Sequence, residues 1–341
     1  MNSVPARADT RAAPDGYAAP DGYAAPDRYT LKRARPLLGT LVEIAAQGAS
    51  EAAVSQAISQ AFAAVETIHA LMSYHDPASD VSRLNRAGIA CIRVDPQTWH
   101  VLDVARSLSE ATAGVFDVSV ARELVRSGYL PEHAGFPVPD PDAHWRHIEL
   151  LPDWRVRLTR PLHIDLGGIA KGYAVDCALH ALEHAGMAAG RVNAGGDLRL
   201  FGERAETIHV RHPRHATQLM PLCQMCSGAV ATSGLYYSRK WLEGRPVSPL
   251  IDARARTACV DSRSVSVLAD DCIVADALTK VVFADPDRAL AALEQFGAHA
   301  VVLDAASGHA DPDALLPDRV RRSGPTGWHT VTAFEPQAAV A

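Results

Sequence analysis

The chain has 341 residues, of which 48% are hydrophobic, enough for a sizeable core in one large domain or two closely joined ones. Its formal net charge is −6, and without a long block of like charge this argues against nucleic acid as a partner. Six scattered cysteines favour reduced thiols. We see no signal-like apolar region near the start and no run of about 18 apolar residues, so we expect a cytoplasmic protein without membrane insertion.

A short tandem repeat dominates the first residues. Ala-Pro-Asp-Gly-Tyr-Ala occurs twice, and a degraded copy follows at 25–29. The segment is rich in Pro, Gly and Asp and has little apolar surface to bury. We therefore predict a flexible leader at residues 1–32 and a folded domain at residues 33–335.

The elements expected after the leader follow from periodicity and capping. Residues 35–46 alternate like a first strand, and residues 50–72 carry apolar side chains at the spacing of an amphipathic helix. Asp95-Pro96 begins a helix that ends at Gly114. Further strands are expected at 155–158, 162–165, 207–211, 230–237, 264–268 and 300–303, a strand, glycine turn and second strand at 191–202, and helices at 271–283 and 285–296. Runs of strands separated by helices, without regular βαβ alternation, predict an α+β fold.

Residues 163–176 form the most informative single stretch, in which an apolar strand end passes through Gly167 and Gly168 into a helix that carries Lys171. Glycines allow close approach of a ligand, and the N–H groups at a helix start favour phosphate. Lys171 adds a mobile positive charge. An ordinary strand–turn–helix junction with a surface lysine explains the stretch equally well, so other segments must decide.

Seven short motifs, each weak alone, occur in order at plausible spacings. They are Leu38-Gly39-Thr40; Met72-Ser73 through Ser79 to Asn85; Gly114-Val115-Phe116-Asp117; the segment from Asp165 to Gly172; the segment from Asn193 to Asp197; Ala231-Thr232-Ser233-Gly234; and Ala275-Asp276-Ala277-Leu278. Together they make the chain from residue 35 to about residue 283 resemble the FAD:protein FMN transferase (ApbE) family.

The resemblance implies an activity and a fold. Family members bind FAD and a divalent metal, usually magnesium, and transfer FMN to a threonine of an acceptor protein with release of AMP; some hydrolyse FAD instead. Residues 33–335 would then be an FAD-binding catalytic domain of α+β type, with mixed or antiparallel sheets and flanking helices. The expected partners are FAD and an acceptor protein that carries a target threonine.

The same resemblance implies roles for individual residues. Asp276 and Lys171 would be catalytic, and the metal ligands would be Asp276, the carbonyl of Gly168 and Thr279. Breaking a pyrophosphate requires neutralisation of charge on oxygen, which a hard cation held by oxygen ligands supplies. Taken alone, Asp276 is better explained as a helix-start carboxylate, and only the other motifs favour the metal ligand. The implied cofactor-binding set is Leu38, His75, Val115, Phe116, Asp117, Asp165, Lys171 and Ile251.

Two departures from the family pattern concern catalysis. Lys280 stands where the family usually has a threonine, four residues after Asp276, and Thr279 precedes it. Thr279 shares a helix face with Asp276, while the Lys280 ammonium either replaces the charge of the cation or repels it. Pro249 replaces the histidine of the family segment His-Ile-Ile-Asp-Pro and cannot accept a proton.

These departures leave three functions open. The leading one is the flavin transferase. The alternatives are an FAD-binding protein with weakened or lost transferase activity, and an FAD pyrophosphatase in which water replaces the threonine.

Overall fold

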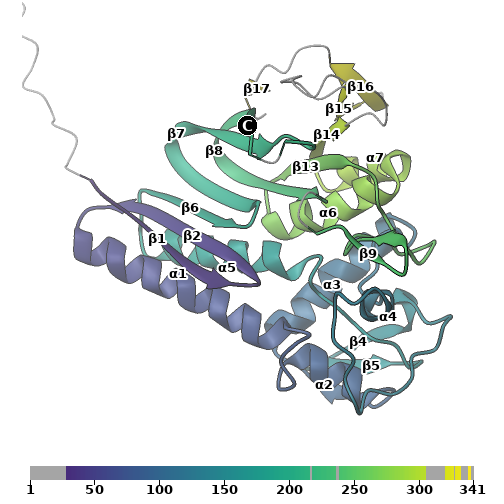
Figure 1. Cartoon of the computed structure of the whole chain (residues 1–341). Coiled ribbons are helices and arrows are strands. Elements are labelled where there is room, and N and C mark those ends of the chain that lie inside the picture. The colour runs from purple at the N-terminus through teal and green to yellow at the C-terminus, as the bar shows by residue number, and fades with distance from the viewer. Residues whose placement is uncertain are drawn as a thin grey trace, which may run out of the picture.

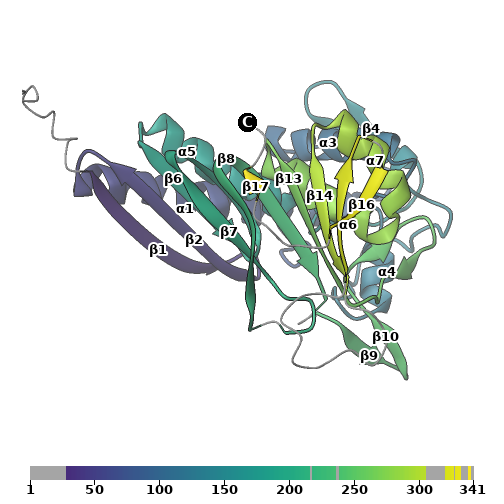
Figure 2. The ribbon, with the colours of Figure 1, turned by 90° about the horizontal axis from the view of Figure 1, so that it is seen from above.

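A computed structural model describes residues 28–215, 217–235, 238–304, 319–325, 327–331 and 337–338. Within these residues, ten strands form one large sheet in the order β1-β2-β6-β7-β8-β13-β14-β15-β16, with β17 beside β8 (Figures 1 and 2). The strands are β1 (Tyr29–Leu37), β2 (Thr40–Gly48), β6 (Ala189–Ala194), β7 (Asp197–Arg211), β8 (Leu219–Gly234), β13 (Arg263–Ala269), β14 (His299–Asp304), β15 (Arg319–Gly324), β16 (Gly327–Val331) and β17 (Gln337–Ala338). All neighbours along the path are antiparallel, and β17 runs parallel to β8. The predicted α+β class is confirmed.

The start of the sheet corrects one prediction. Residues 35–46 do not form one strand but the end of β1, a two-residue turn and the beginning of β2. Leu38 and Gly39 have φ values of 55° and 71°, the left-handed conformation that a tight hairpin turn requires. Strand β1 begins at Tyr29, inside the range predicted as leader. Residues 1–27, which hold most of the repeat, lie outside the described residues.

Three helices cover one face of the sheet. Helix α1 (Glu51–Met72) packs on β1 and β2, α5 (Ala170–His184) on β6 and β7, and α6 (Cys272–Ala284) on β8 and β13 (Figure 1). The predicted helix at residues 50–72 is confirmed, with Ser50 as its N-cap. Helix α7 (Pro286–Gln295) packs against α6.

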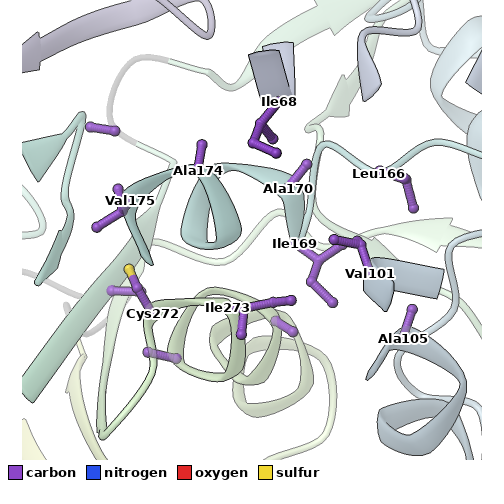
Figure 3. Packing of buried hydrophobic residues seen from close by; sticks show 14 of the residues in the cluster. Ile68, Val101, Ala105, Leu166, Ile169, Ala170, Ala174, Val175, Cys272 and Ile273 are labelled. Atoms are coloured by element: carbon purple, nitrogen blue, oxygen red, sulfur yellow. The ribbon is translucent and has the colours of Figure 1, made fainter. Parts of the chain in front are cut away.

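Helix α5 is central to this layer. Figure 3 shows it between Ile68 of α1 and the pair Cys272 and Ile273 of α6. A Cβ at Gly172 would lie 2.3 Å from the backbone oxygen of Cys272. Because any larger residue would collide with this backbone, glycine permits the close approach of α5 and α6.

A smaller group of elements, here called the lobe, lies beyond the end of α1 (Figure 1). It contains α2 (Asp80–Ala87), α3 (Pro96–Ala111), α4 (Ala121–Arg126), the 3₁₀ helix Trp145–His147 and a sheet of β3 (Ile92–Arg93), β5 (Arg155–Leu158) and β4 (Ile148–Leu151). Asp95 caps α3 as predicted. Two small hairpins complete the described fold: β9 (Lys240–Leu242) with β10 (Arg245–Val247), and β11 (Ile251–Asp252) with β12 (Thr257–Ala258). No helix in the described part of the chain has the length and apolar character needed to cross a membrane.

The strand predicted at residues 162–165 is wrong, because the segment pairs with no strand among the described residues. The buried side chain of Asn85 takes the place of a neighbouring strand. Its Nδ2 donates to the carbonyl of Ile164 at 2.9 Å, and its Oδ1 accepts from the Ile164 N–H at 2.7 Å. The next N–H, of Asp165, donates to the carbonyl of Val118 at 2.8 Å. These hydrogen bonds fix the position of Asp165 and of the Gly167-Gly168 pair that follows it.

Candidate functional site

A cleft of about 700 Å³ lies where the turns of the large sheet meet α1, α5 and the lobe. This volume is within the usual range for small-molecule sites. Its lining includes every residue of the predicted cofactor-binding set: Leu38, His75, Val115, Phe116, Asp117, Asp165, Lys171 and Ile251. Gly168 and Lys280 also line it, while Asp276 and Thr279 lie behind the wall and are fully buried.

Two glycine-containing turns fit together at one end of the cleft. The predicted strand–turn–strand at residues 191–202 is present, with Gly195 and Gly196 joining β6 to β7. Gly195 has a φ of 66°, and a Cβ there would lie 2.4 Å from Oγ1 of Thr40. Glycine is therefore required for this turn to pack against the start of β2. The turn places Asp197 on the cleft wall.

A cluster of two lysines and two aspartates forms the wall beside Gly168. Lys171 Nζ lies 2.5 Å from Oδ2 of Asp197 and 3.4 Å from Oδ2 of Asp276. Lys280 Nζ contacts Oδ1 of Asp276 and lies 2.8 Å from the Asp276 backbone oxygen. The expectation that Lys171 is a mobile charge is wrong, because carboxylates on β7 and α6 hold its ammonium in place.

Burial and charge together set the protonation of this cluster. Burial favours a neutral Asp276, but Lys171 and Lys280 outweigh it and lower the pKa of that carboxyl. Burial and the neighbouring Asp276 raise the pKa of Asp197. For Lys171, burial opposes the charge, and the carboxylates of Asp197 and Asp276 nevertheless raise its pKa. Asp276 and Lys171 therefore form a charged pair inside the wall.

The start of α5 differs from an open anion-binding turn. The N–H of Ala170 donates to the carbonyl of Leu166 at 2.8 Å. The N–H of Gly172 donates to Oδ2 of Asp276 at 3.0 Å. These donors at the helix start, which we expected to favour phosphate, are already engaged by the protein. The remaining positive character on this wall comes from Lys171 and Lys280, both of which line the cleft.

The residues implied as metal ligands do not fit a divalent cation as they are arranged. Both carboxylate oxygens of Asp276 already accept contacts, Oδ1 from Lys280 and Oδ2 from Gly172 and Lys171. Thr279 Oγ1 donates to the Asp276 carbonyl and shares a hydrogen bond with Ser233 Oγ, each at 2.7 Å. The described residues contain no group of three or more His, Cys, Asp or Glu that could hold a metal ion. The Lys280 ammonium therefore lies against the carboxylate that the resemblance implies as a metal ligand.

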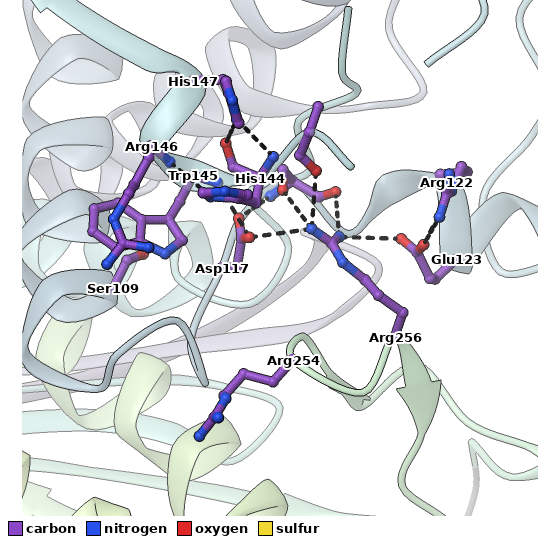
Figure 4. Close-up of polar contacts among 12 residues, drawn as sticks. Ser109, Asp117, Arg122, Glu123, His144, Trp145, Arg146, His147, Arg254 and Arg256 are labelled. Atoms are coloured by element: carbon purple, nitrogen blue, oxygen red, sulfur yellow. Dashed lines mark hydrogen bonds and ion pairs between the residues drawn. The ribbon is translucent and has the colours of Figure 1, made fainter. Parts of the chain in front are cut away.

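Asp117 lines the cleft, but its carboxylate binds the surrounding loops. Oδ1 accepts from the N–H of Ser119 at 2.7 Å and Oδ2 from that of Trp145 at 3.2 Å. Burial raises its pKa. Arg256 Nη2 lies 3.4 Å from Oδ2, and the same guanidinium donates to the carbonyls of Ser119 and Ala143 (Figure 4). Sequence reasoning missed Arg256, because nothing near it in the chain indicates a partner 139 residues away.

Two tyrosines of the cleft were also missed. Tyr74 is 3% exposed, and its ring packs against His133 and Phe136, at centroid distances of 5.2 and 5.9 Å. The Tyr129 hydroxyl lies 2.6 Å from the carbonyl oxygen of Ser238. Tyr74 directly precedes the exposed His75, which belongs to the implied cofactor-binding set. The cleft therefore has an aromatic wall that a linear motif did not reveal.

Known proteins of one family match this chain over most of its length. A model of the ApbE family matches residues 38–303. This chain belongs to the ApbE family. A curated FAD:protein FMN transferase of Chlamydia pneumoniae is 27% identical over 246 residues, which cover 68% of this chain and 76% of that protein. One of Vibrio cholerae is 28% identical over 247 residues, covering 67% and 74%.

Solved structures of the ApbE family share the fold. The ApbE protein of Thermotoga maritima has a TM-score of 0.72 and 27% identity, covering 81% of this chain and 94% of its own. The Pseudomonas stutzeri flavinyl transferase ApbE, in its apo form, has a TM-score of 0.68 at 20% identity, covering 89% and 94%. The predicted ApbE-like α+β fold is thus confirmed.

Proposed function

We propose that this ApbE-family chain is an FAD:protein FMN transferase that binds FAD in the cleft and moves its FMN moiety to a threonine of an acceptor protein. One observation carries the proposal: motifs far apart in the sequence converge on a single cleft. Leu38, Val115, Asp165, Asp197 and Ser233, each from a different motif, all line it. The relatives named FAD:protein FMN transferase support the same activity.

The reaction exchanges one phosphorus–oxygen bond for another. The threonine oxygen attacks the phosphorus on the FMN side of the pyrophosphate, the bond from that phosphorus to the bridging oxygen breaks, and AMP leaves with the electron pair. The hydroxyl proton passes to a base. Such a transfer depends on positioning and on neutralising oxygen charge. Lys171, whose side chain is 32% exposed and held by Asp197, supplies fixed positive charge at the wall.

Asp165 is our candidate for the base. Pro249 lines the cleft where the family usually has a histidine, and it offers no proton acceptor. Asp165 also lines the cleft, and burial raises its pKa to about 6. A carboxyl with this pKa is ionised at neutral pH and more basic than an ordinary aspartate, as general-base catalysis requires.

The test measures both products. Purified full-length protein is incubated with FAD and a panel of threonine-containing acceptor proteins. Nucleotides are then separated by chromatography, and the masses of the acceptor proteins are measured by mass spectrometry. We expect AMP together with an acceptor that has gained the mass of FMN. AMP with free FMN would identify a pyrophosphatase instead, and bound but intact FAD would identify a binding protein; either result would contradict the transferase.

A further inference from the structure

We propose that the ammonium of Lys280 takes the place of a divalent cation in this site, so that FAD binds and its pyrophosphate is neutralised without metal. The inference rests on the proposed function, in which FAD occupies the cleft. It concerns a residue that departs from the family pattern, and it follows from the contacts of that residue in the fold.

The position of the ammonium is set by α6 itself. Lys280 follows Asp276 by one helical turn, and its Nζ contacts both the carboxylate Oδ1 and the backbone oxygen of Asp276. Asp276 is fully buried, and the Lys280 side chain is 16% exposed. A Cβ placed on Gly168 would lie 3.7 Å from Lys280 Cε. The lysine stem therefore lies under the glycine turn, and its charge is next to the groups implied as metal ligands.

Two of those groups, Thr279 and Asp276, already have their side-chain oxygens engaged by the protein. Thr279 is fully buried and its hydroxyl is bonded to the Asp276 carbonyl and to Ser233. The second carboxylate oxygen of Asp276 accepts from Gly172 and lies near Lys171. A divalent ion would have to displace one ammonium and remain beside another, and like charges at this range repel strongly. The cluster already balances two lysines with two aspartates.

Lys280 can also perform the electrostatic task. An ammonium has three N–H donors, and Asp276 accounts for two acceptors. Lys280 lines the cleft, so a third donor can reach a pyrophosphate oxygen. Hydrogen bonds between an ammonium and a phosphate oxygen are charge-assisted and strong. The ammonium therefore supplies to the pyrophosphate the positive charge that a bound cation would otherwise supply.

FAD titration of the full-length protein tests the inference. Binding is followed by flavin fluorescence after dialysis against EDTA, and again in millimolar Mg²⁺. We expect the same Kd within about twofold in both conditions, because a fixed ammonium needs no metal. Detectable binding only in Mg²⁺ would overturn the role of Lys280 and leave the proposed function standing. Absence of binding in both conditions would overturn the proposed function, and the inference with it.

Variants sharpen the test, with circular dichroism as the check on folding. Lys280→Met should weaken FAD binding about tenfold or more in EDTA and in Mg²⁺ alike, as expected for loss of a hydrogen bond to a charged group. Lys280→Thr should show the loss in EDTA and recover in Mg²⁺, and it should bind Mn²⁺ detectably by electron paramagnetic resonance, whereas the unaltered protein should not. Lys32→Met is the matched control, since Lys32 pairs with Glu43 on the outer strands. Mn²⁺ bound by the unaltered protein would contradict the inference even if the variants failed to fold.

Discussion

Asp165 shows how one residue connects the fold to the chemistry. Its backbone is held by Val118, and its Oδ2 accepts from the N–H of Gly167 at 3.2 Å. Burial raises its pKa to about 6, although Gly167 and Lys171 act in the opposite direction. Its charge in turn adds to the burial that raises the pKa of Tyr74 to about 12. The carboxyl therefore changes charge near pH 6, where the change would alter the affinity of the cleft for a negatively charged dinucleotide.

The pH dependence of FAD binding follows from this shift. Asp165 is neutral below about pH 6 and negative above it, and FAD carries a negative pyrophosphate. We expect FAD affinity to fall as pH rises from about 5 to about 8. We expect Asp165→Asn to make this decrease in FAD affinity about fivefold smaller, which fluorescence titration can measure.

The rate of AMP release distinguishes electrostatic repulsion of FAD by Asp165 from a role of Asp165 as the base. If Asp165 is the base, Asp165→Asn should slow AMP release at neutral pH by about a hundredfold while FAD binds more tightly. An unchanged rate would contradict the role as base. An unchanged pH profile of binding would contradict the electrostatic account.

At the scale of elements, contacts from distant segments fix the walls of the cleft. Helix α6 has no side-chain cap of its own. Instead, Asp176 of α5 accepts from the N–H groups of Cys272 and Ile273, both at 2.8 Å. This cap fixes the start of α6 against α5 and hence the place of Lys280. Arg256 acts similarly for the hairpin of β11 and β12, because it joins the hairpin to the loop of Asp117.

Removing the Arg256 contact should destabilise the protein. Arg256→Met leaves the buried carboxylates of Asp117 and Glu123, whose side chains are 2% and 6% exposed, without this guanidinium. Loss of one partner of a buried ion pair costs about 3 kcal/mol, which urea unfolding can measure. Arg254→Met, on the same hairpin and exposed, is the control and should change stability little. Equal effects of the two variants would show that the network does not stabilise the fold.

For the whole molecule, the cleft depends on three parts that are separate along the chain. The sheet contributes Leu38 and Asp197, the lobe contributes Phe116, and the small hairpin contributes Ile251. One continuous core joins buried apolar residues of the sheet layer to those of the lobe, and a second cluster lies on β7, β8, β14 and β15. A ligand that contacts all three parts binds only the folded arrangement and should therefore stabilise the entire domain.

FAD should raise the free energy of unfolding accordingly. At a free FAD concentration about 100 times its Kd, the expected gain is about 2.7 kcal/mol, measured by urea unfolding. The gain should persist in EDTA if Lys280 supplies the positive charge. FMN alone, tested at the same concentration, serves as the control and should stabilise less, because it lacks the pyrophosphate. Equal stabilisation by FMN and FAD would contradict pyrophosphate recognition.

The sequence by itself determined the elements whose signals are local. Helix α1 and the start of α3 were predicted because apolar periodicity, Ser50 and Asp95-Pro96 act within a few residues. The turn at Leu38 was missed because a leucine at positive φ has no strong sequence signal. The ordered motifs also predicted residues that line one cleft, among them Asp165 and Lys171, and the departure at Lys280 lies in the same cleft.

Only the tertiary structure decided how those residues interact. Three sets of hydrogen bonds join segments that are 79 to 139 residues apart. They link Asn85 to Ile164, Arg256 to Asp117, and Asp176 to the start of α6. Such contacts depend on the packing of whole elements, which neighbouring residues do not encode. The sequence left open whether Lys280 repels a cation or replaces it. Its contacts with Asp276, in a wall where the Thr279 hydroxyl is already bonded to the Asp276 carbonyl and to Ser233, favour replacement.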